Sequence, residues 1–109
     1  MSQDRVPGVS GKEALILELL LQKPLNEMFG LELVGCSDGQ LKRGTVYVTL
    51  GRMEDKHYIE SHLEDRPLGS VGLPRRLYRV TGYGQRAYAA WRMAREARKL
   101  LFDSGEVLA

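Results

Sequence analysis

The first strongly apolar segment, from Lys12 to Lys23, is expected to form a helix. It is dense in leucine, and its glutamate and lysine residues also favour helical structure. Ser10 stands where an N-cap is needed, and Glu13, three residues later, completes a capping box. Pro24 cannot continue a helix, so the helix should end before it.

A second, shorter apolar segment follows. Its apolar residues occur at mixed spacing, and the pattern predicts a short helix from about residue 26 to residue 35. Asn26 is placed to cap this helix. Gly35 or Gly39 could end it, because glycine is the usual residue just beyond a helix C-terminus.

Residues 42 to 56 carry an apolar stripe with helical spacing. Val46, Leu50 and Met53 fall at positions i, i+4 and i+7, which places them on one face that should pack against the core. Gly51 lies inside this predicted helix, where it costs roughly 1 kcal/mol relative to alanine. We therefore expect a neighbouring group to need the space that a side chain would fill.

The periodicity then changes from helical to alternating. The stretches 58–64 and 75–81 alternate apolar with polar residues and are predicted to be strands. Between them, the sequence DRPLGSVGLP contains two glycines, two prolines and a serine. This composition predicts a hairpin loop that is longer than a tight turn.

The last predicted helix runs from about residue 82 to residue 102, with Thr81 as its N-cap. Small apolar residues recur in it at alternating spacings of three and four, which is the heptad pattern of paired helices. Because these side chains are small, a partner helix could approach closely. The expected dimer interface consists of Ala87, Ala90, Trp91, Ala94, Ala97 and Leu101.

The order of these elements predicts the fold class. Three helices followed by a hairpin indicate an α+β, mainly α, fold: a winged helix-turn-helix with three helices and a two-stranded β wing, plus a C-terminal dimerisation helix. We expect residues 1–10 to form a flexible N-terminal tail and residues 11–81 the winged-helix DNA-binding domain. Residues 82–109 would form the C-terminal dimerisation helix and tail.

Charge is unevenly distributed along this 109-residue chain. Residues 1–41 hold three basic and six acidic side chains, whereas residues 42–99 hold thirteen basic and six acidic ones. A basic second half favours a polyanionic partner, although an ordinary solvated surface would explain it equally well. No apolar run is long enough to span a membrane, and a single cysteine fits a cytoplasmic protein.

The opening turn of the third helix carries Lys42 and Arg43, although helix N-termini normally favour acidic groups. Cations become useful there when a phosphate group lies opposite, because the helix terminus and the side chains attract the same anion. Tyr47 suits a phosphate contact or could instead be a packed core aromatic residue. The candidate DNA-binding residues are Lys42, Arg43, Thr45, Tyr47, Val48, Arg52, Lys56, Arg75 and Arg76.

Other kinds of site find little support. The sequence has no GxSxG, HExxH, Walker A or CxxC motif, so we expect no enzyme activity, no catalytic residues and no cofactor. His57 and His62 have no convincing third ligand, so no metal site is expected. Cys36 is interpreted as a small buried residue rather than a redox sensor.

Two runs of residues resemble the PadR family of transcriptional regulators. The first run is TVYVTLGRMEDKHYIE and the second is PRRLYRVTGYGQRAY. The resemblance as a whole extends over about residues 12–102. The chain departs from the family pattern at His57, where the family has glycine, and it ends soon after one C-terminal helix, as in the short form. The matching positions are Gly44, Thr45, Val46, Tyr47, Leu50, Met53, Glu54, Arg76, Tyr78, Val80, Thr81 and Gly84.

This resemblance implies a homodimer built on the last helix that binds double-stranded DNA, with an inverted repeat as the expected target, and acts as a repressor. It also implies an effector pocket at the dimer interface in some members. Trp91 could pack in that interface or provide an aromatic platform for a small planar effector. A winged-helix module that binds protein rather than DNA remains the alternative, because a fold does not fix a function.

Overall fold

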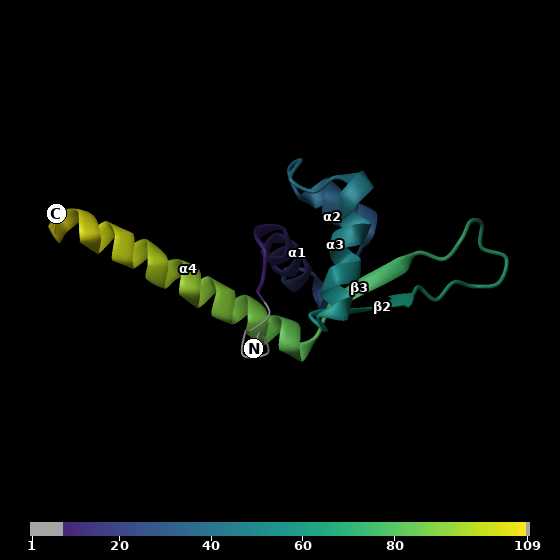
Figure 1. Ribbon diagram of the computed structural model, residues 1–109. Helices are drawn as coiled ribbons and strands as arrows, with labels where there is room; N and C mark the ends of the chain where they lie inside the picture. The colour runs from purple at the N-terminus through teal and green to yellow at the C-terminus, as the bar shows by residue number, and fades with distance from the viewer. Residues whose placement is uncertain (1–7, 109) are drawn as a thin grey trace.

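Three helices, a small antiparallel sheet and a long final helix follow one another in the computed structural model, which describes residues 8–108 (Figure 1). The helix α4 and the hairpin between β2 and β3 extend from opposite sides of the central helices, so the molecule measures 67 × 35 × 26 Å. The elements are α1 (Gly11–Leu21), the 3-10 turn η2 (Pro24–Asn26), β1 (Glu27–Phe29), α2 (Gly30–Cys36), α3 (Arg43–Asp55), β2 (Ile59–Leu63), β3 (Arg76–Val80) and α4 (Gly82–Leu108).

The predicted capping box of α1 is confirmed. The backbone N–H of Glu13 donates to the Ser10 hydroxyl oxygen at 3.2 Å, and the backbone N–H of Ser10 donates to the Glu13 carboxylate at 2.9 Å. The third helix and both predicted strands also lie where the sequence pattern placed them. The fourth helix begins at Gly82 as predicted, but it continues to Leu108 instead of ending near residue 102. The expected tail over residues 1–10 falls largely outside the described residues.

The prediction of a helix from residue 26 was wrong over its first turn. Residues 27–29 form β1, which pairs antiparallel with β3, so the sheet has the order β1-β3-β2. Leu25 and Asn26 have φ angles of 60° and 55°, and this left-handed backbone prevents a helix from starting at Asn26. The helix α2 begins only at Gly30, where the Phe29 N–H donates to the Glu32 carboxylate at 2.8 Å.

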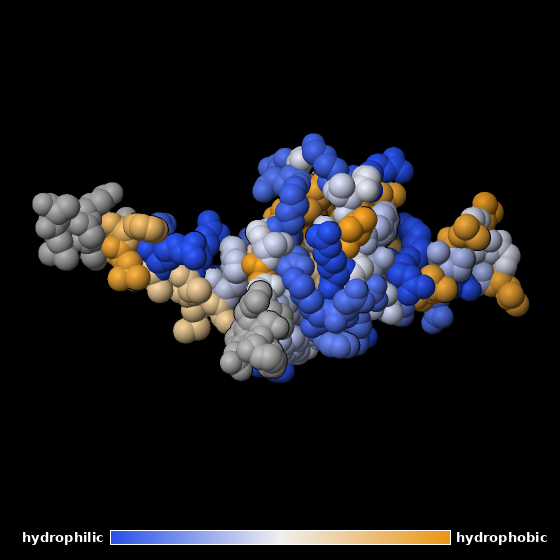
Figure 2. All heavy atoms as spheres, viewed as in Figure 1, coloured by the Kyte–Doolittle hydropathy of each residue, from blue (hydrophilic) through white to orange (hydrophobic). Residues whose placement is uncertain are grey.

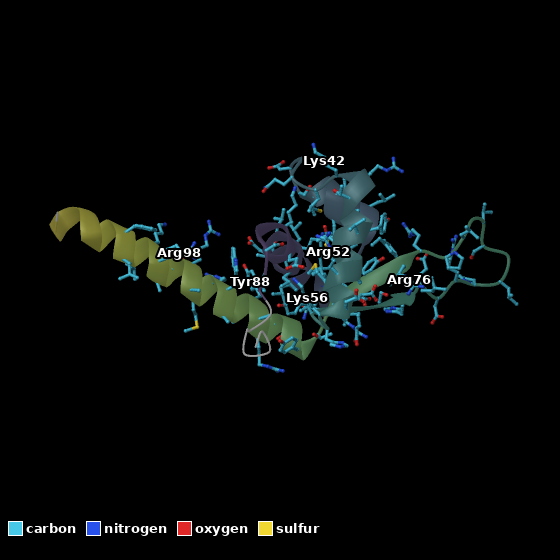
Figure 3. All side chains as sticks on the ribbon, in the orientation of Figure 1. Lys42, Arg52, Lys56, Arg76, Tyr88 and Arg98 are labelled. Atoms are coloured by element: carbon cyan, nitrogen blue, oxygen red, sulfur yellow. The ribbon has the colours of Figure 1, made fainter. Side chains whose placement is uncertain are left out.

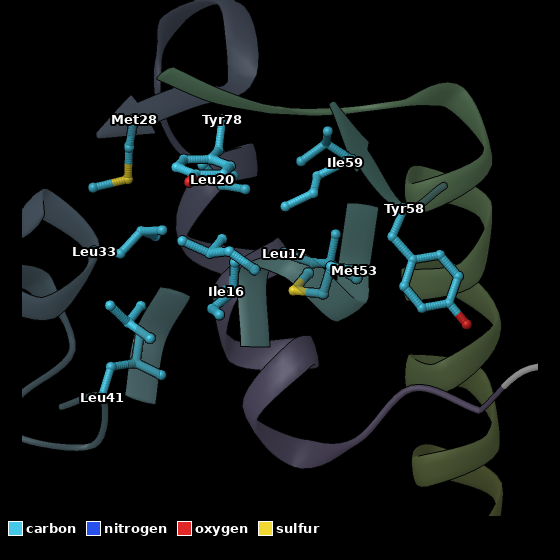
Figure 4. Close-up of a cluster of buried hydrophobic side chains, with 13 residues drawn as sticks. Ile16, Leu17, Leu20, Met28, Leu33, Leu41, Met53, Tyr58, Ile59 and Tyr78 are labelled. Carbon is cyan, nitrogen blue, oxygen red and sulfur yellow. The ribbon is translucent and has the colours of Figure 1, made fainter. Parts of the chain in front are cut away.

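The core lies between α1, α3 and the sheet (Figure 4). Val46, Leu50 and Met53 are all buried, as their spacing predicted. Cys36 is exposed, so its interpretation as a buried residue was wrong: Leu33 already occupies the core position of the seven-residue helix α2. The remaining cluster members are Ile16, Leu17, Leu20, Met28, Leu41, Tyr58, Ile59, Tyr78 and Val80.

One ion pair joins the start of α1 to the end of α3. The Glu13 side chain is buried, with the residue only 2% exposed, and its carboxylate oxygens lie 2.9 and 3.0 Å from the Lys56 ammonium nitrogen. The same ammonium donates to the Gly8 carbonyl at 3.2 Å. A buried carboxylate needs such partners, because an unpaired charge is costly away from water.

A second junction fixes the start of α4. The Gly84 N–H donates to the Thr81 hydroxyl oxygen at 2.9 Å, which confirms Thr81 as the cap, and this hydroxyl donates to the His57 carbonyl at 2.6 Å. Gly84 is buried against Tyr58, and a Cβ atom on Gly84 would overlap the Tyr58 carbonyl oxygen. Only glycine therefore allows α4 to begin this close to the turn after α3.

We expect His57→Gly to stabilise the protein. His57 has a φ angle of 64°, the left-handed conformation that glycine adopts without strain, so the change should raise the free energy of unfolding by about 1 kcal/mol. Urea denaturation would measure it. The control His62→Gly, in strand β2, should lower the free energy of unfolding, because glycine weakens a strand. A loss of stability in both variants would contradict the argument.

We expect Glu13→Ala to lower the free energy of unfolding by about 2 kcal/mol, because it removes charged hydrogen bonds to Lys56 and the capping contact to Ser10. The same denaturation experiment would measure this loss. The control Glu18→Ala changes an exposed glutamate of the same helix that accepts one hydrogen bond, from Tyr88, and should cost at most about 1 kcal/mol. Equal losses in both variants would show that the ion pair contributes nothing.

Candidate nucleic-acid interface

The exposed side of α3 carries cations that have no ionic partner. Lys42, Arg43 and Arg52 are exposed, and none forms an ion pair with any side chain of residues 8–102. Figure 3 shows Lys42 at the start of α3 and Arg52 farther along the same helix. Lys42 occupies the N-cap position without a capping side-chain bond, so the α3 terminus adds its own positive potential to these charges. This arrangement favours an anion.

Lys56, at the other end of α3, differs from these cations. Its ammonium group is held by Glu13 and by the Gly8 carbonyl, as described above. Unlike the exposed cations, the Lys56 side chain is partly buried, and its ammonium nitrogen lies 5.6 Å from the centre of the Tyr58 ring. These contacts favour a structural role for Lys56, whereas the sequence alone grouped it with the DNA-binding candidates.

Tyr47 combines packing with exposure. A Cβ atom on Gly30 would lie 2.6 Å from the Tyr47 ring, so the absence of a side chain at residue 30 makes room for it. The residue is nevertheless 49% exposed. Tyr47 lines a small cleft together with Phe29, Arg75 and Arg76, which brings the start of α2, the helix α3 and the root of the wing to one place.

The two arginines at the root of the wing have different surroundings. The Arg75 guanidinium lies 3.8 Å from the centre of the Phe29 ring and 3.2 Å from the Glu64 carboxylate. The hydrogen bond from Arg75 lowers the pKa of the Glu64 carboxyl, so this pair stays ionised. Arg76 forms no ion pair within the described chain and donates to the Ser61 hydroxyl at 3.1 Å. Arg76 is thus the cation of the wing root that is free to meet a phosphate.

The tip of the wing is apolar. Residues 67–74 contain no charged side chain, and Leu68, at 103% exposed, projects fully into solvent. Figure 2 shows apolar side chains at the far end of the hairpin. Arg66 is turned toward its own loop and donates to the Leu73 carbonyl at 2.8 Å. Phosphate-binding groups therefore gather at the root of the wing and on α3.

The outward face of α3 is small and apolar at its centre. Val48 is 56% exposed, and Gly44 and Gly51 lie near it on neighbouring turns. Apart from the adjoining residues and the backbone of α3 itself, no atom of the described chain lies within 4 Å of where a Cβ on either glycine would be. No group of the described chain fills the space beside Gly51, so the neighbour expected from the sequence is not found within the chain.

The helix α4 exposes a continuous apolar face beyond the winged helix. Of the predicted interface residues, only Ala87 packs partly against the core and Trp91 is half-buried. At helical spacing, the exposed members share one side of α4 with further apolar residues. This side consists of Ala90, Met93, Ala94, Ala97, Leu100 and Leu101.

Trp91 lies between two clefts. It borders one with Glu18 and Tyr88, and another with Val9 and Tyr83. Its ring stacks on that of Tyr88, with 6.1 Å between ring centres, and Arg95 lies 5.3 Å from the centre of the indole ring. An aromatic and cationic surface of this kind can hold a planar group.

Two further sequence-based expectations concern metal and membrane binding. Among the described side chains, those of residues 8–102, no group of three or more histidine, cysteine, aspartate or glutamate residues is arranged to hold a metal ion. No helix in the same range is long and apolar enough to cross a membrane.

Phe29, Gly30 and Glu64 were missed as parts of this surface. They position Tyr47 and Arg75 through contacts between elements that are distant in the sequence. Gly30 stood inside the segment assigned to the second helix, and no local pattern marks a glycine that accommodates an aromatic ring from another helix. The arrangement of the side chains could be found only from the fold.

Comparison with protein families gives one match. The family described as "Transcriptional regulator PadR-like family" matches residues 16–90. No curated protein sequence matches the chain.

Solved structures share the fold. A PadR family transcription regulator from Clostridium difficile R20291 is 27% identical, with a TM-score of 0.65 over 88% of this chain and 96% of that one. A PadR-like transcriptional regulator from Bacillus cereus is 22% identical, with a TM-score of 0.63 over 85% and 88%. Bacillus subtilis PadR in complex with operator DNA is 20% identical, with a TM-score of 0.61 over 76% of this chain and 47% of that one.

Proposed function

Because the chain belongs to the PadR-like family of transcriptional regulators, we propose that it is a homodimeric repressor that binds an inverted repeat in double-stranded DNA. The observation that carries this proposal is the set of unpaired cations on the exposed side of α3, namely Lys42, Arg43 and Arg52. The complex of Bacillus subtilis PadR with operator DNA supports it by analogy of fold. This role is regulatory rather than catalytic.

In the proposed complex, α3 enters the major groove and its early residues approach the base edges. Lys42, Arg43 and Tyr47 contact phosphate groups, and the N-terminus of α3 attracts the same anions. Thr45 and Val48 face the bases, with Arg52 beyond them. At the root of the wing, Arg76 holds the DNA backbone together with Arg75, while Lys56 maintains the position of α3 through Glu13.

The proposed dimer pairs the exposed apolar faces of two α4 helices. An apolar face of this length on an unpaired helix favours association, and its alanines allow the helix axes to approach closely. Residues 11–81 then act as the DNA-binding unit and residues 82–109 as the dimerisation unit. A two-fold axis between the helices would place two α3 helices on half-sites about one turn of DNA apart.

Trp91 is the proposed contact for a small planar effector. The Tyr88 ring and the Arg95 guanidinium beside it would stack on such a molecule or bind its charge. Because Trp91 is the one tryptophan of the chain, its fluorescence would report binding directly.

The alternative function, a module that binds protein, makes a different prediction for salt. DNA binding through phosphate contacts releases counterions, so the affinity falls steeply as salt rises. A protein adaptor need not behave in this way. Selection of bound sequences from random duplex DNA at two salt concentrations would separate the two, and enrichment of an inverted repeat would support the dimeric repressor.

We expect Arg43→Ala to weaken operator binding and to reduce the salt dependence by about one unit of slope, because one phosphate contact is lost. Tyr47→Phe should also weaken binding while leaving folding intact. Fluorescence anisotropy with the selected operator, over a salt series, would measure both variants. The matched control Arg98→Ala removes an exposed arginine of α4 and should bind like the wild type. Wild-type affinity in both α3 variants would refute the assignment of α3 as the recognition helix.

We expect Ala97→Glu to convert the dimer into a monomer, because two buried carboxylates would face each other across the α4 pair. Light scattering after size-exclusion chromatography would measure the molecular mass. The control Lys99→Glu places the same side chain on the charged side of α4 and should remain dimeric. A dimer in both variants would show that α4 does not pair through this face.

A further inference from the structure

The centre of the α3 outward face offers an apolar group rather than a hydrogen-bonding one. Val48 points away from the buried stripe formed by Val46, Leu50 and Met53, and it is 56% exposed. An exposed valine in the middle of a helix gains nothing from the core, and valine has a lower helix propensity than alanine. In the proposed complex this side chain lies on the side of α3 that meets the DNA.

The residues around Val48 leave its methyl groups projecting beyond the helix surface. Gly44 lies one turn before it and Gly51 one turn after it, and neither has a side chain to keep the helix backbone away from a partner. The Thr49 hydroxyl is directed to the Thr45 carbonyl at 3.4 Å, within the helix. Close approach of the helix backbone is thus permitted beside the Val48 methyl groups, with the exposed Arg52 one turn farther along the same face.

The base pairs offer one apolar group in the major groove, the 5-methyl group of thymine. A valine has no donor or acceptor for the other base edges, and it would leave the polar groups of guanine or cytosine unpaired where it excludes water. The chemistry of this position therefore selects thymine.

We infer that Val48 is a specificity-determining residue that reads a thymine methyl group, so that the half-site carries a thymine opposite the middle of α3. This inference rests on the proposed function, because it requires α3 to lie in the major groove. Gly44 and Gly51 allow the helix to sit close enough for the contact.

The test removes the thymine methyl group without changing any hydrogen bond. In the operator selected from random DNA, each thymine of a half-site is replaced in turn by deoxyuridine, and the affinity of each duplex is measured by fluorescence anisotropy. With wild-type protein, one position should lose on the order of fourfold in affinity, the value of one buried methyl-sized group. Val48→Ala should bind the thymine operator more weakly and should no longer distinguish thymine from deoxyuridine at that position.

Two further variants separate this role from general effects. Val71→Ala makes the same substitution at an exposed valine of the wing and should retain the wild-type response to deoxyuridine at that position. Gly51→Ala should raise the midpoint of thermal unfolding by about 4 °C, through its better helix propensity, and yet weaken operator binding. A glycine without a role at the DNA would show the first effect alone.

The outcomes distinguish the inference from the function on which it rests. Sequence-specific binding that is unchanged by every deoxyuridine substitution would overturn the inference and leave the regulator intact. A loss at one position that is equally large in Val48→Ala would assign the methyl contact to another residue and also overturn it. If the wild-type protein selects no sequence, the proposed function itself fails.

Discussion

The buried carboxylate of Glu13 is the constraint on which the placement of α3 depends. It accepts hydrogen bonds from the first residue of its own capping box and from Lys56, which follows the last turn of α3. A charge with so little exposure has to keep these partners, because losing one would leave it unpaired away from water. The C-terminal end of α3 is thereby tied to α1, and the N-terminal end, with its free cations, faces outward.

The surface assigned to DNA is assembled from segments that are far apart in the sequence. The short strand β1 pairs with β3 and so brings Phe29 and Gly30 against Arg75 and Tyr47. The start of α2, the middle of α3 and the root of the wing thus form one surface. Two of its cations, Lys56 and Arg75, are paired with the carboxylates of Glu13 and Glu64, whereas Lys42, Arg43, Arg52 and Arg76 have no ionic partner among the described side chains.

Features that depend on neighbouring residues could be predicted from the sequence. The capping box at Ser10, the buried stripe of α3 and the alternating strands each follow from local spacing, and all are present. The strand β1 could not be predicted in this way, because three residues are too few to show a period and their pairing partner lies about fifty residues away. The same reason applies to Lys56, whose partner Glu13 is 43 residues distant. Which cations of the site are free is therefore a property of the fold.

The tight junction between Gly84 and Tyr58 makes α4 a lever. With its 27 residues, the helix is ~40 Å long, and it is anchored to the winged helix only near its first turns. A tilt of about 5° at such an anchor moves the far end of α4 by about 3.5 Å. If the far ends were instead fixed in a dimer, the same tilt would move the winged helix at the near end by a similar distance. In the proposed dimer, small changes in the crossing of two α4 helices would be converted into larger changes in the distance between two α3 helices. The stiffness of this anchor, which also includes the Thr81 cap and the hydrogen bond from Tyr88 to Glu18, would in this way set how sharply the proposed dimer measures the spacing of its half-sites.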